Sequence, residues 1–191
     1  PVPTSYMAET SEYDFVGGYD YQKEAGLLHV ADHHISPGKK QWTWGCGDFG
    51  KAWDRNLTDE DGPYIELMTG VYTENQPDFT WLKPFEEKTF TQYFMPYKKV
   101  GAVKNATIHA VLNAELKKEQ LHMTVYGTAC YEQAEVVVKK QGQEIYREAA
   151  RISPVDIFEK EIPVGETKAS ALHVSVYADG RLLVDYQPKE E

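Results

Sequence analysis

Short stretches in which apolar and polar residues alternate recur along the chain and predict β-strands. Successive side chains of a strand point to opposite faces, so a half-buried strand has a hydrophobic period of two. The stretches are rich in β-branched and aromatic residues and are bounded by Gly, Pro and Asp. No stretch of the first half shows a convincing helical period, so we expect strands and loops there. The first-half strands are expected at 26–31, 39–45, 63–72 and 88–97.

The second half carries a more regular strand pattern. Tight turns are expected at 141–143 and 178–181, and the Asp-Gly pair of the second turn is a strong hairpin signal. Seven short strands in about ninety residues are typical of an immunoglobulin-like sandwich, here without its Cys-Trp-Cys core. The seven strands are expected at 106–114, 120–127, 134–140, 144–149, 156–162, 171–178 and 181–187.

The composition changes around residues 95–105. Tryptophans and Pro-Gly loops precede this stretch, and the regular pattern that follows contains no Trp. We therefore predict an all-β chain with two domains: a first β segment over 1–98 and an immunoglobulin-like β-sandwich over 99–191.

Charge and composition exclude several classes of function. A net charge of −10 argues against nucleic acid and anionic membranes as partners, because both bind basic surfaces. No apolar run approaches the roughly 20 residues of a membrane helix. The two cysteines, Cys46 and Cys130, are too few for a disulfide framework and suit a reducing compartment. We expect a cytoplasmic protein rather than a periplasmic or secreted one, and a start at Pro1 that hides any targeting signal.

Residues 29–44, HVADHHISPGKKQWTW, concentrate histidine and tryptophan. Because the flanking pattern predicts strand, turn and strand, His29 and His33 are expected about 13 Å apart, too far to share an ion. His33 and His34 are adjacent and would point to opposite faces of an extended segment. A metal site would need an irregular backbone and a carboxylate from elsewhere. We therefore expect hydrogen-bonded loop histidines, with no metal and no other cofactor.

The segment GCGDFGK at 45–51 has the G-x-G-x-x-G spacing of dinucleotide-binding loops. That motif requires a helix whose N-terminus approaches a pyrophosphate. The residues that follow are expected to form an acidic loop, whose carboxylates would repel phosphate. We conclude that the spacing does not mark a nucleotide site.

Two tryptophans and a glutamate are the most distinctive side chains of the first half. Trp42 and Trp44 share one face of their strand and form either a core layer or an exposed stacking platform. Glu66 shares a face with Tyr64 and Met68. A glutamate in mid-strand is disfavoured unless it meets solvent, a cation or a ligand. Glu66 is therefore either paired with Lys or Arg or a functional carboxylate in a cleft.

Residues 14–97, from DFVGGYDYQKEAGLLHVADHHISPGKKQWTWG to WLKPFEEKTFTQYFMPY, resemble the bacterial DUF5107 domain family, whose members commonly precede tetratricopeptide repeats. The segment is also similar to the C-terminal half of the galactose mutarotase (aldose 1-epimerase) supersandwich. The resemblance implies a mutarotase-like β-sandwich segment for residues 1–98. Since only the later half of that fold is represented, open sheet edges are expected.

The remoter resemblance also implies catalytic roles. In mutarotases a glutamate near the end of the fold is the general base at the anomeric hydroxyl, and a histidine protonates the ring oxygen. The order YIELMTGVYTENQPDF, then WLKPFEEKTFTQYF, resembles that arrangement and implies Glu66 as the matching carboxylate. His33 and His34 are the candidate acids, although neither maps onto the mutarotase histidine, and LKPFEE departs from the usual Pro-Gly turn.

The leading hypothesis is a carbohydrate-recognition module of a larger bacterial multidomain protein. Two alternatives stay open: an aldose 1-epimerase-like enzyme with Glu66 as base and His33 or His34 as acid, and a non-catalytic scaffold that packs against a repeat domain. Expected partners are a carbohydrate, other domains of the same polypeptide such as tetratricopeptide repeats, and a second copy of the chain bound through open sheet edges. Besides Glu66, His33 and His34, the expected ligand-binding residues are Trp42, Trp44, Lys40, Asn75, Asp78 and Trp81.

Overall fold

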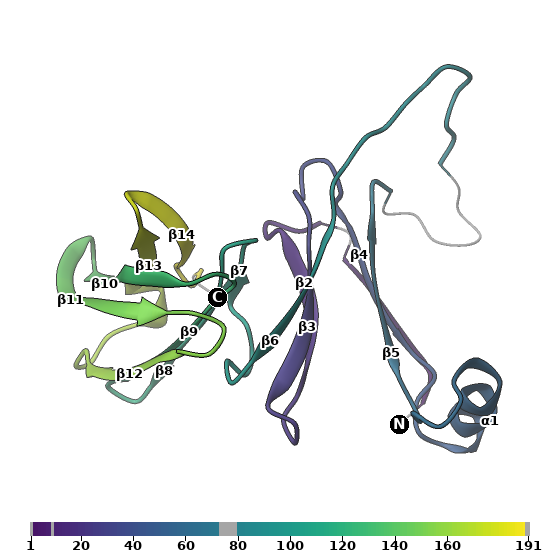
Figure 1. Cartoon of the computed structure of the whole chain (residues 1–191), viewed down its shortest axis with the longest axis horizontal. Coiled ribbons are helices and arrows are strands. Elements are labelled where there is room, and N and C mark those ends of the chain that lie inside the picture. The colour runs from purple at the N-terminus through teal and green to yellow at the C-terminus, as the bar shows by residue number, and fades with distance from the viewer. Residues whose placement is uncertain (1, 9, 73–79, 190–191) are drawn as a thin grey trace. The chain divides into compact units, whose positions relative to one another are not determined.

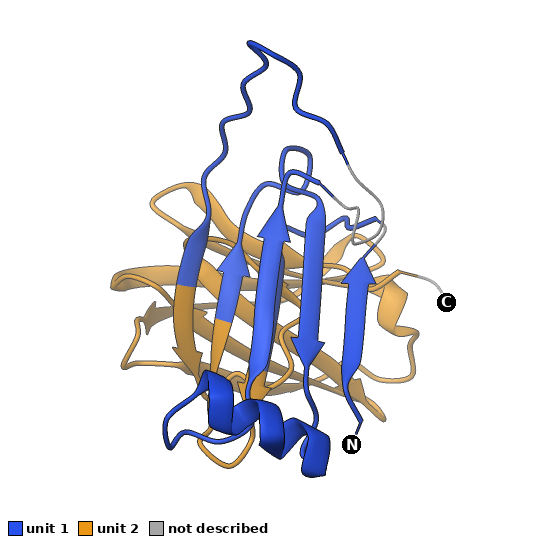
Figure 2. Ribbon diagram, turned by 90° about the vertical axis from the view of Figure 1, so that its right-hand side faces the viewer, with its two compact units in different colours: residues 1–18, 28–94 blue, residues 19–27, 95–191 orange. Residues whose placement is uncertain are grey.

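The computed structural model describes residues 2–8, 10–72 and 80–189. The described residues form four β-sheets, one α-helix and one short 3-10 helix (Figure 1). The prediction of an all-β sandwich fold is therefore confirmed. The chain divides into two compact units (Figure 2): unit 1 comprises residues 1–18 and 28–94, and unit 2 comprises residues 19–27 and 95–191.

Unit 1 contains an antiparallel sheet with the strand order β1-β4-β5. Its strands are β1 (Thr4–Ala8), β4 (Gly38–Thr43) and β5 (Ile65–Gly70). The register pairs Trp42 of β4 with Ser5 of β1 and with Glu66 of β5. The expected strands at 39–45 and 63–72 are thus present, whereas the sequence pattern gave no sign of β1.

A helix, α1 (Asp48–Leu57), connects the end of β4 to the start of β5 (Figure 2). The expectation of an acidic loop over residues 52–64 is therefore wrong for residues 52–57, which belong to α1, whereas residues 58–64 form an irregular connection. The apolar side chains at 49, 53 and 57 lie four residues apart, which is a helical spacing that the acidic residues between them obscured.

The glycines of the G-x-G-x-x-G spacing have a structural role at the start of α1. Gly45 has φ +76°, and a Cβ added at Gly50 would overlap the carbonyl oxygen of Gly45. The spacing thus permits a close turn into the helix. Asp48 occupies the first turn, where its carboxylate opposes anion binding, so a phosphate is disfavoured although a helix is present.

A second three-stranded sheet has the order β2-β3-β6. It contains β2 (Phe15–Asp20), β3 (Ala25–Val30) and β6 (Tyr93–Lys98). The division between the units passes through all three strands. Only the end of the strand expected at 88–97 is present, because residues 80–92 form no regular strand.

Unit 2 contains a sandwich of two four-stranded sheets, β11-β10-β13-β14 and β12-β9-β8-β7. One hydrophobic core takes side chains from both sheets, including Leu112, Val125, Val136 and Val176, none of which is exposed. The elements are β7 (Asn105–Ala106), β8 (Ala110–Lys117), β9 (Gln120–Gly127), β10 (Tyr131–Lys140), β11 (Gln143–Ile152), β12 (Phe158–Pro163), the 3-10 helix η1 (Ala169–Ala171), β13 (Leu172–Ala178) and β14 (Arg181–Tyr186).

Both turns predicted in the second half are confirmed. Gln141 and Gly142 have φ values of 50° and 81° and connect β10 to β11. Asp179 and Gly180 have φ values of 52° and 71° and connect β13 to β14. Two successive positive φ values characterise the type I′ turn, whose twist matches that of the flanking strands. Neither helix among the described residues has the length and apolarity that a bilayer crossing requires.

Candidate functional site

One face of sheet β1-β4-β5 collects several of the residues that the sequence singled out. Because side chains alternate along a strand, Lys40 and Trp42 of β4 lie on the same face as Glu66 and Met68 of β5. Trp44 and Tyr64 continue this face just beyond the strands. We use "tryptophan face" for Trp42, Trp44, Tyr64 and Glu66 together with Trp53 of α1.

The indoles of Trp44 and Trp53 form a stacked pair. Their ring centroids lie 4.8 Å apart with 18° between the planes. Phe49, one helical turn before Trp53, lies edge-on to it at 6.4 Å. Trp53 is 39% exposed and Phe49 57%, so α1 presents aromatic surface to solvent beside the more buried Trp44.

A chain of hydrogen bonds links this aromatic pair to Glu66. The Nε1–H of Trp44 donates to the Tyr64 hydroxyl at 3.3 Å, and that hydroxyl donates to Glu66 Oε1 at 3.4 Å. The side chains of Tyr64 and Glu66 are half-buried. One carboxylate oxygen is therefore fixed by the tyrosine, and the carboxylate retains further acceptor capacity for a ligand.

The other predicted ligand residues differ in their surroundings. Trp42 is half-buried, and its Nε1 is enclosed without a hydrogen-bond partner among the described residues. Trp81 is 82% exposed. It belongs to the segment that follows β5, whereas α1, which carries Trp53, precedes β5. Asn75 and Asp78 lie outside the described residues.

The histidine segment forms a turn instead of an extended strand. Residues 33–35 are in turn conformation, and the ring centroids of His33 and His34 lie 3.9 Å apart. The expectation that the two side chains point to opposite faces is therefore wrong, because it assumed extended backbone. His33 Nδ1 pairs with Asp14 Oδ1 at 2.7 Å, and His34 Nδ1 pairs with Asp32 Oδ1 at 3.1 Å.

Glu66 and the two histidines belong to different ends of the sheet. The turn with His33 and His34 leads into Gly38, which pairs with Gly70. Glu66 lies four residues before Gly70 on β5, a distance of about 13 Å along an extended strand. The hydrogen-bond partner of Glu66 is Tyr64, whereas those of the histidines are Asp14 and Asp32. These contacts form two separate groups.

Two buried polar side chains lie near the histidine turn. Lys39 is 5% exposed and His29 1%, and the Lys39 Nζ has no hydrogen-bond partner in the described part of the chain. Burial lowers the pKa of Lys39, and the carboxylates of Asp14 and Asp32 partly oppose this. Burial also lowers the pKa of His29, with Gln92 opposing and the Lys39 charge adding to the decrease.

Sequence reasoning missed several residues of these two groups. Trp53 was missed with its helix, although the spacing of Phe49, Trp53 and Leu57 carried a signal. Asp14 was missed because its pairing with His33 spans 19 positions, which no local pattern reveals. Lys39 resembles any exposed lysine of an alternating strand until the structure shows its burial.

Unit 2 has an open recess of about 860 Å³. No residue that the sequence singled out lines it. The Lys140 ammonium, at its border, already donates to the carbonyl oxygens of Val164 and Glu166. The recess therefore offers less specific chemistry than the tryptophan face.

Two protein families match the chain over successive ranges. Residues 3–105 match the family described as "Domain of unknown function (DUF5107)". Residues 105–186 match the family described as "YphG-like protein, second domain". The second match begins with the first residue of β7 and ends with the last residue of β14, so it coincides with the sandwich of unit 2.

Proposed function

We propose that this chain, which belongs to the DUF5107 family, is a carbohydrate-recognition module of a larger bacterial protein and that the tryptophan face binds the sugar. The observation that carries the proposal is the Trp44–Trp53 stack beside a carboxylate that Tyr64 holds in place. Flat aromatic surface next to a fixed polar group provides apolar contact and orientation together.

The residues of this face have distinct roles in the proposal. The exposed rings of Trp53 and Phe49 stack on the C–H surface of a pyranose, and Trp44 supports them from behind. Glu66 accepts hydrogen bonds from sugar hydroxyls through the lone pairs that Tyr64 does not use. Lys40, on the same face, supplies a donor at the edge of the site. The resemblance to the mutarotase supersandwich that the sequence suggests favours a sugar as ligand by analogy of fold alone.

The geometry favours recognition over the epimerase alternative. An epimerase needs a base and an acid on opposite sides of one sugar ring, both within hydrogen-bonding reach of it. Glu66 lies with Tyr64 on the tryptophan face, whereas His33 and His34 lie with Asp14 and Asp32 at the other end of the sheet. A sugar on the tryptophan face would meet the carboxylate without a histidine opposite.

Ligand-detected NMR with a panel of mono- and oligosaccharides tests the proposal. We expect saturation-transfer signals for at least one sugar, and we expect Trp53→Ala and Glu66→Gln each to weaken binding about tenfold. Such a loss is typical of removing a central aromatic or hydrogen-bonded anchor. Phe85→Ala is the matched control, because Phe85 is fully exposed and belongs to the segment after β5. The absence of signals for every sugar, or equal loss in the control, would overturn the proposal.

A second candidate function is supported by the apolar side chains of residues 80–92. Trp81, Leu82 and Phe85 are all exposed within a few residues of one another. Clustered exposed apolar side chains mark protein-binding surfaces. We infer that this segment docks on another domain of the same polypeptide, such as a repeat domain.

The double variant Leu82→Ser with Phe85→Ser is then expected to abolish association with that domain in sedimentation experiments. The control variant Trp53→Ala is expected to leave association unchanged. The reverse pattern would exclude this function.

A further inference from the structure

Asp14 and Asp32 hold the two neighbouring histidines in the same way. Asp14 Oδ1 accepts the backbone N–H of His33 at 2.9 Å and the ring Nδ1–H of the same residue at 2.7 Å. Asp32 Oδ1 accepts the backbone N–H of His34 at 2.9 Å and its ring Nδ1–H at 3.1 Å. Each carboxylate therefore fixes both the backbone and the imidazole of one histidine.

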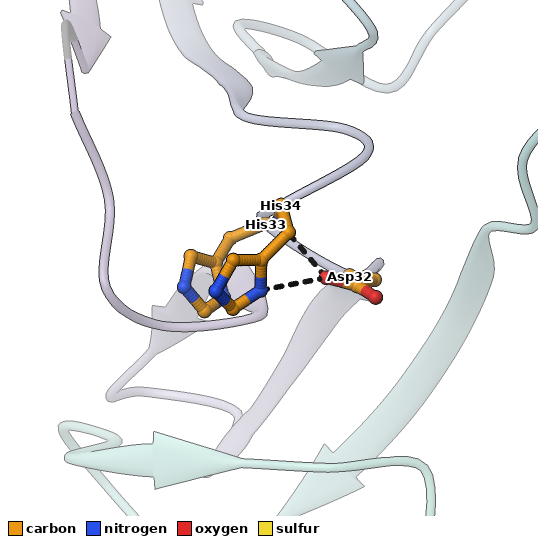
Figure 3. Close-up of side chains that lie close together, drawn as sticks. All are labelled: Asp32, His33 and His34. Carbon is orange, nitrogen blue, oxygen red and sulfur yellow. Dashed lines mark hydrogen bonds and ion pairs between the residues drawn. The ribbon is translucent and has the colours of Figure 1, made fainter.

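These contacts determine the tautomer of both neutral imidazoles. An ionised carboxylate only accepts hydrogen bonds, so each Nδ1 carries the proton and each Nε2 keeps a lone pair. The two rings lie side by side with 39° between their planes. Figure 3 shows that each ring has a nitrogen on the side away from Asp32. Two nitrogen lone pairs are thus presented together by adjacent residues.

We propose that His33 and His34 bind one divalent transition-metal ion of the zinc or copper type through their Nε2 atoms. Imidazole nitrogen is a preferred ligand of these ions, and a metal-binding histidine commonly donates its other N–H to a carboxylate. Asp14 and Asp32 are then positioning residues, and water completes the coordination. This site is independent of the proposed carbohydrate site on the tryptophan face.

The distances and exposures suit an ion that binds from solvent. Asp32, His33 and His34 each offer an atom able to bind a metal, and these atoms lie within 4.8 Å of one another. Zinc–nitrogen bonds of about 2.1 Å place two nitrogen ligands of one ion at most about 4.2 Å apart, so binding through both Nε2 atoms requires the two rings to adjust toward one ion. The side chain of His34 is 79% exposed and has room for this movement.

The charges around His33 and His34 include some that favour cation binding and one that opposes it. Asp14 and Asp32 provide two negative charges, and the net charge of −10 favours cations. Lys39 interacts electrostatically with both carboxylates and partly offsets them. The sequence argued against a metal site because such a site would need an irregular backbone and a carboxylate from elsewhere in the chain. The segment forms a turn, and Asp14 supplies a carboxylate from a distant part of the chain.

Isothermal titration of the intact chain with zinc chloride at neutral pH tests the proposal. We expect one ion per chain, and about tenfold weaker binding in His33→Gln and in His34→Gln. Asp14→Asn is expected to weaken binding by about tenfold as well, as is typical when the carboxylate behind a ligand is lost. Long-range ¹H–¹⁵N spectra of the imidazoles are expected to show shifted Nε2 signals for two residues while each Nδ1 stays protonated.

His122→Gln is the matched control, because His122 Nδ1 pairs with Glu161 at 2.7 Å in the same manner. This variant is expected to bind zinc like the unmodified chain. The proposal is overturned if zinc does not bind saturably, or if His34→Gln binds as tightly as the unmodified chain. It is also overturned if replacing the exposed Cys46 and Cys130 by serine abolishes binding. Since His34 is largely exposed, its replacement does not disturb the folded core.

Discussion

Trp44, just beyond the end of β4, stacks on Trp53 of α1 with ring centroids 4.8 Å apart and 18° between the planes. This contact joins a strand to a helix that follows it after a close turn. It supplies the aromatic half of the tryptophan face, and the bond from Trp44 through Tyr64 to Glu66 supplies the polar half. The sugar-binding proposal depends on both halves being held together.

Tyr64→Phe tests whether the tyrosine hydroxyl connects the two halves. Its loss removes one acceptor from Trp44 Nε1 and one donor to Glu66, so we expect the free energy of unfolding to decrease by about 0.5–1.5 kcal/mol. All four tryptophans belong to unit 1, so their fluorescence during urea unfolding reports on that unit. Tyr6→Phe, at an exposed position of β1, is the control and should change stability by less than about 0.5 kcal/mol. Equal effects of the two replacements would contradict a structural role for the Tyr64 hydroxyl.

Lys39→Met should stabilise unit 1. The Lys39 ammonium is buried without a hydrogen-bond partner among the described residues, and burial lowers its pKa. Replacing an unsatisfied buried polar group by an apolar one of similar length should raise the free energy of unfolding by about 1–3 kcal/mol. The gain should shrink as the pH rises toward the ordinary lysine pKa of 10.5, above which Lys39 is neutral in both states. A loss of stability at neutral pH would show instead that the Lys39 charge contributes to folding.

His29 should make unit 1 sensitive to acid. Burial lowers the pKa of His29 below its ordinary value of 6.5, so the unfolded state binds this proton more readily than the folded state. The contribution of neutral His29 to the free energy of unfolding is fully present above the pKa that this residue has in the unfolded state. It is lost as the pH falls from 6.5 through the pKa of His29 in the folded state. His29→Leu should reduce the slope of stability against pH in this range, measured by urea unfolding between pH 7.5 and about 5. If the free energies of unfolding of His29→Leu and of the unmodified chain changed with pH in parallel, a lowered pKa of His29 would be refuted.

Gly50→Ala should disrupt the turn into α1. A Cβ at residue 50 would overlap the carbonyl oxygen of Gly45 and crowd that of Trp44 at 2.7 Å, so backbone must move. We expect a loss of at least about 1–3 kcal/mol, the usual range for overpacking. Lys51→Ala, at the next and exposed helix position, is the control and should be close to neutral. Circular dichroism and tryptophan fluorescence during unfolding measure both variants.

Strands were predicted well where alternation and turn residues agreed. The hairpin at Asp179 and Gly180 is an example, because an Asp-Gly pair and the flanking period of two indicate the same structure. Alternation also predicted that Trp42 and Trp44 share one face and that Glu66 shares a face with Tyr64 and Met68. The register adds that these two faces are the same one. Local periodicity is enough for such features because they depend on neighbouring residues.

Features that depend on distant residues escaped prediction. The pairing of Asp14 with His33 and the burial of Lys39 arise from tertiary packing. Helix α1 was missed for another reason: its apolar spacing is helical, but Asp48, Asp54 and the adjacent Gly residues are poor helix formers. Because the segment is acidic, the prediction favoured a loop over the helix that the spacing of its apolar residues indicates.

The most direct test of the tryptophan face is a sugar titration followed through the four indole N–H signals in ¹H–¹⁵N spectra. The signals are assigned with single Trp→Phe variants. Our account predicts that a sugar that binds shifts the signals of Trp44 and Trp53 along one saturable curve and leaves that of Trp81 in place. A shift confined to Trp81, or binding without movement of the Trp44 and Trp53 signals, would contradict it.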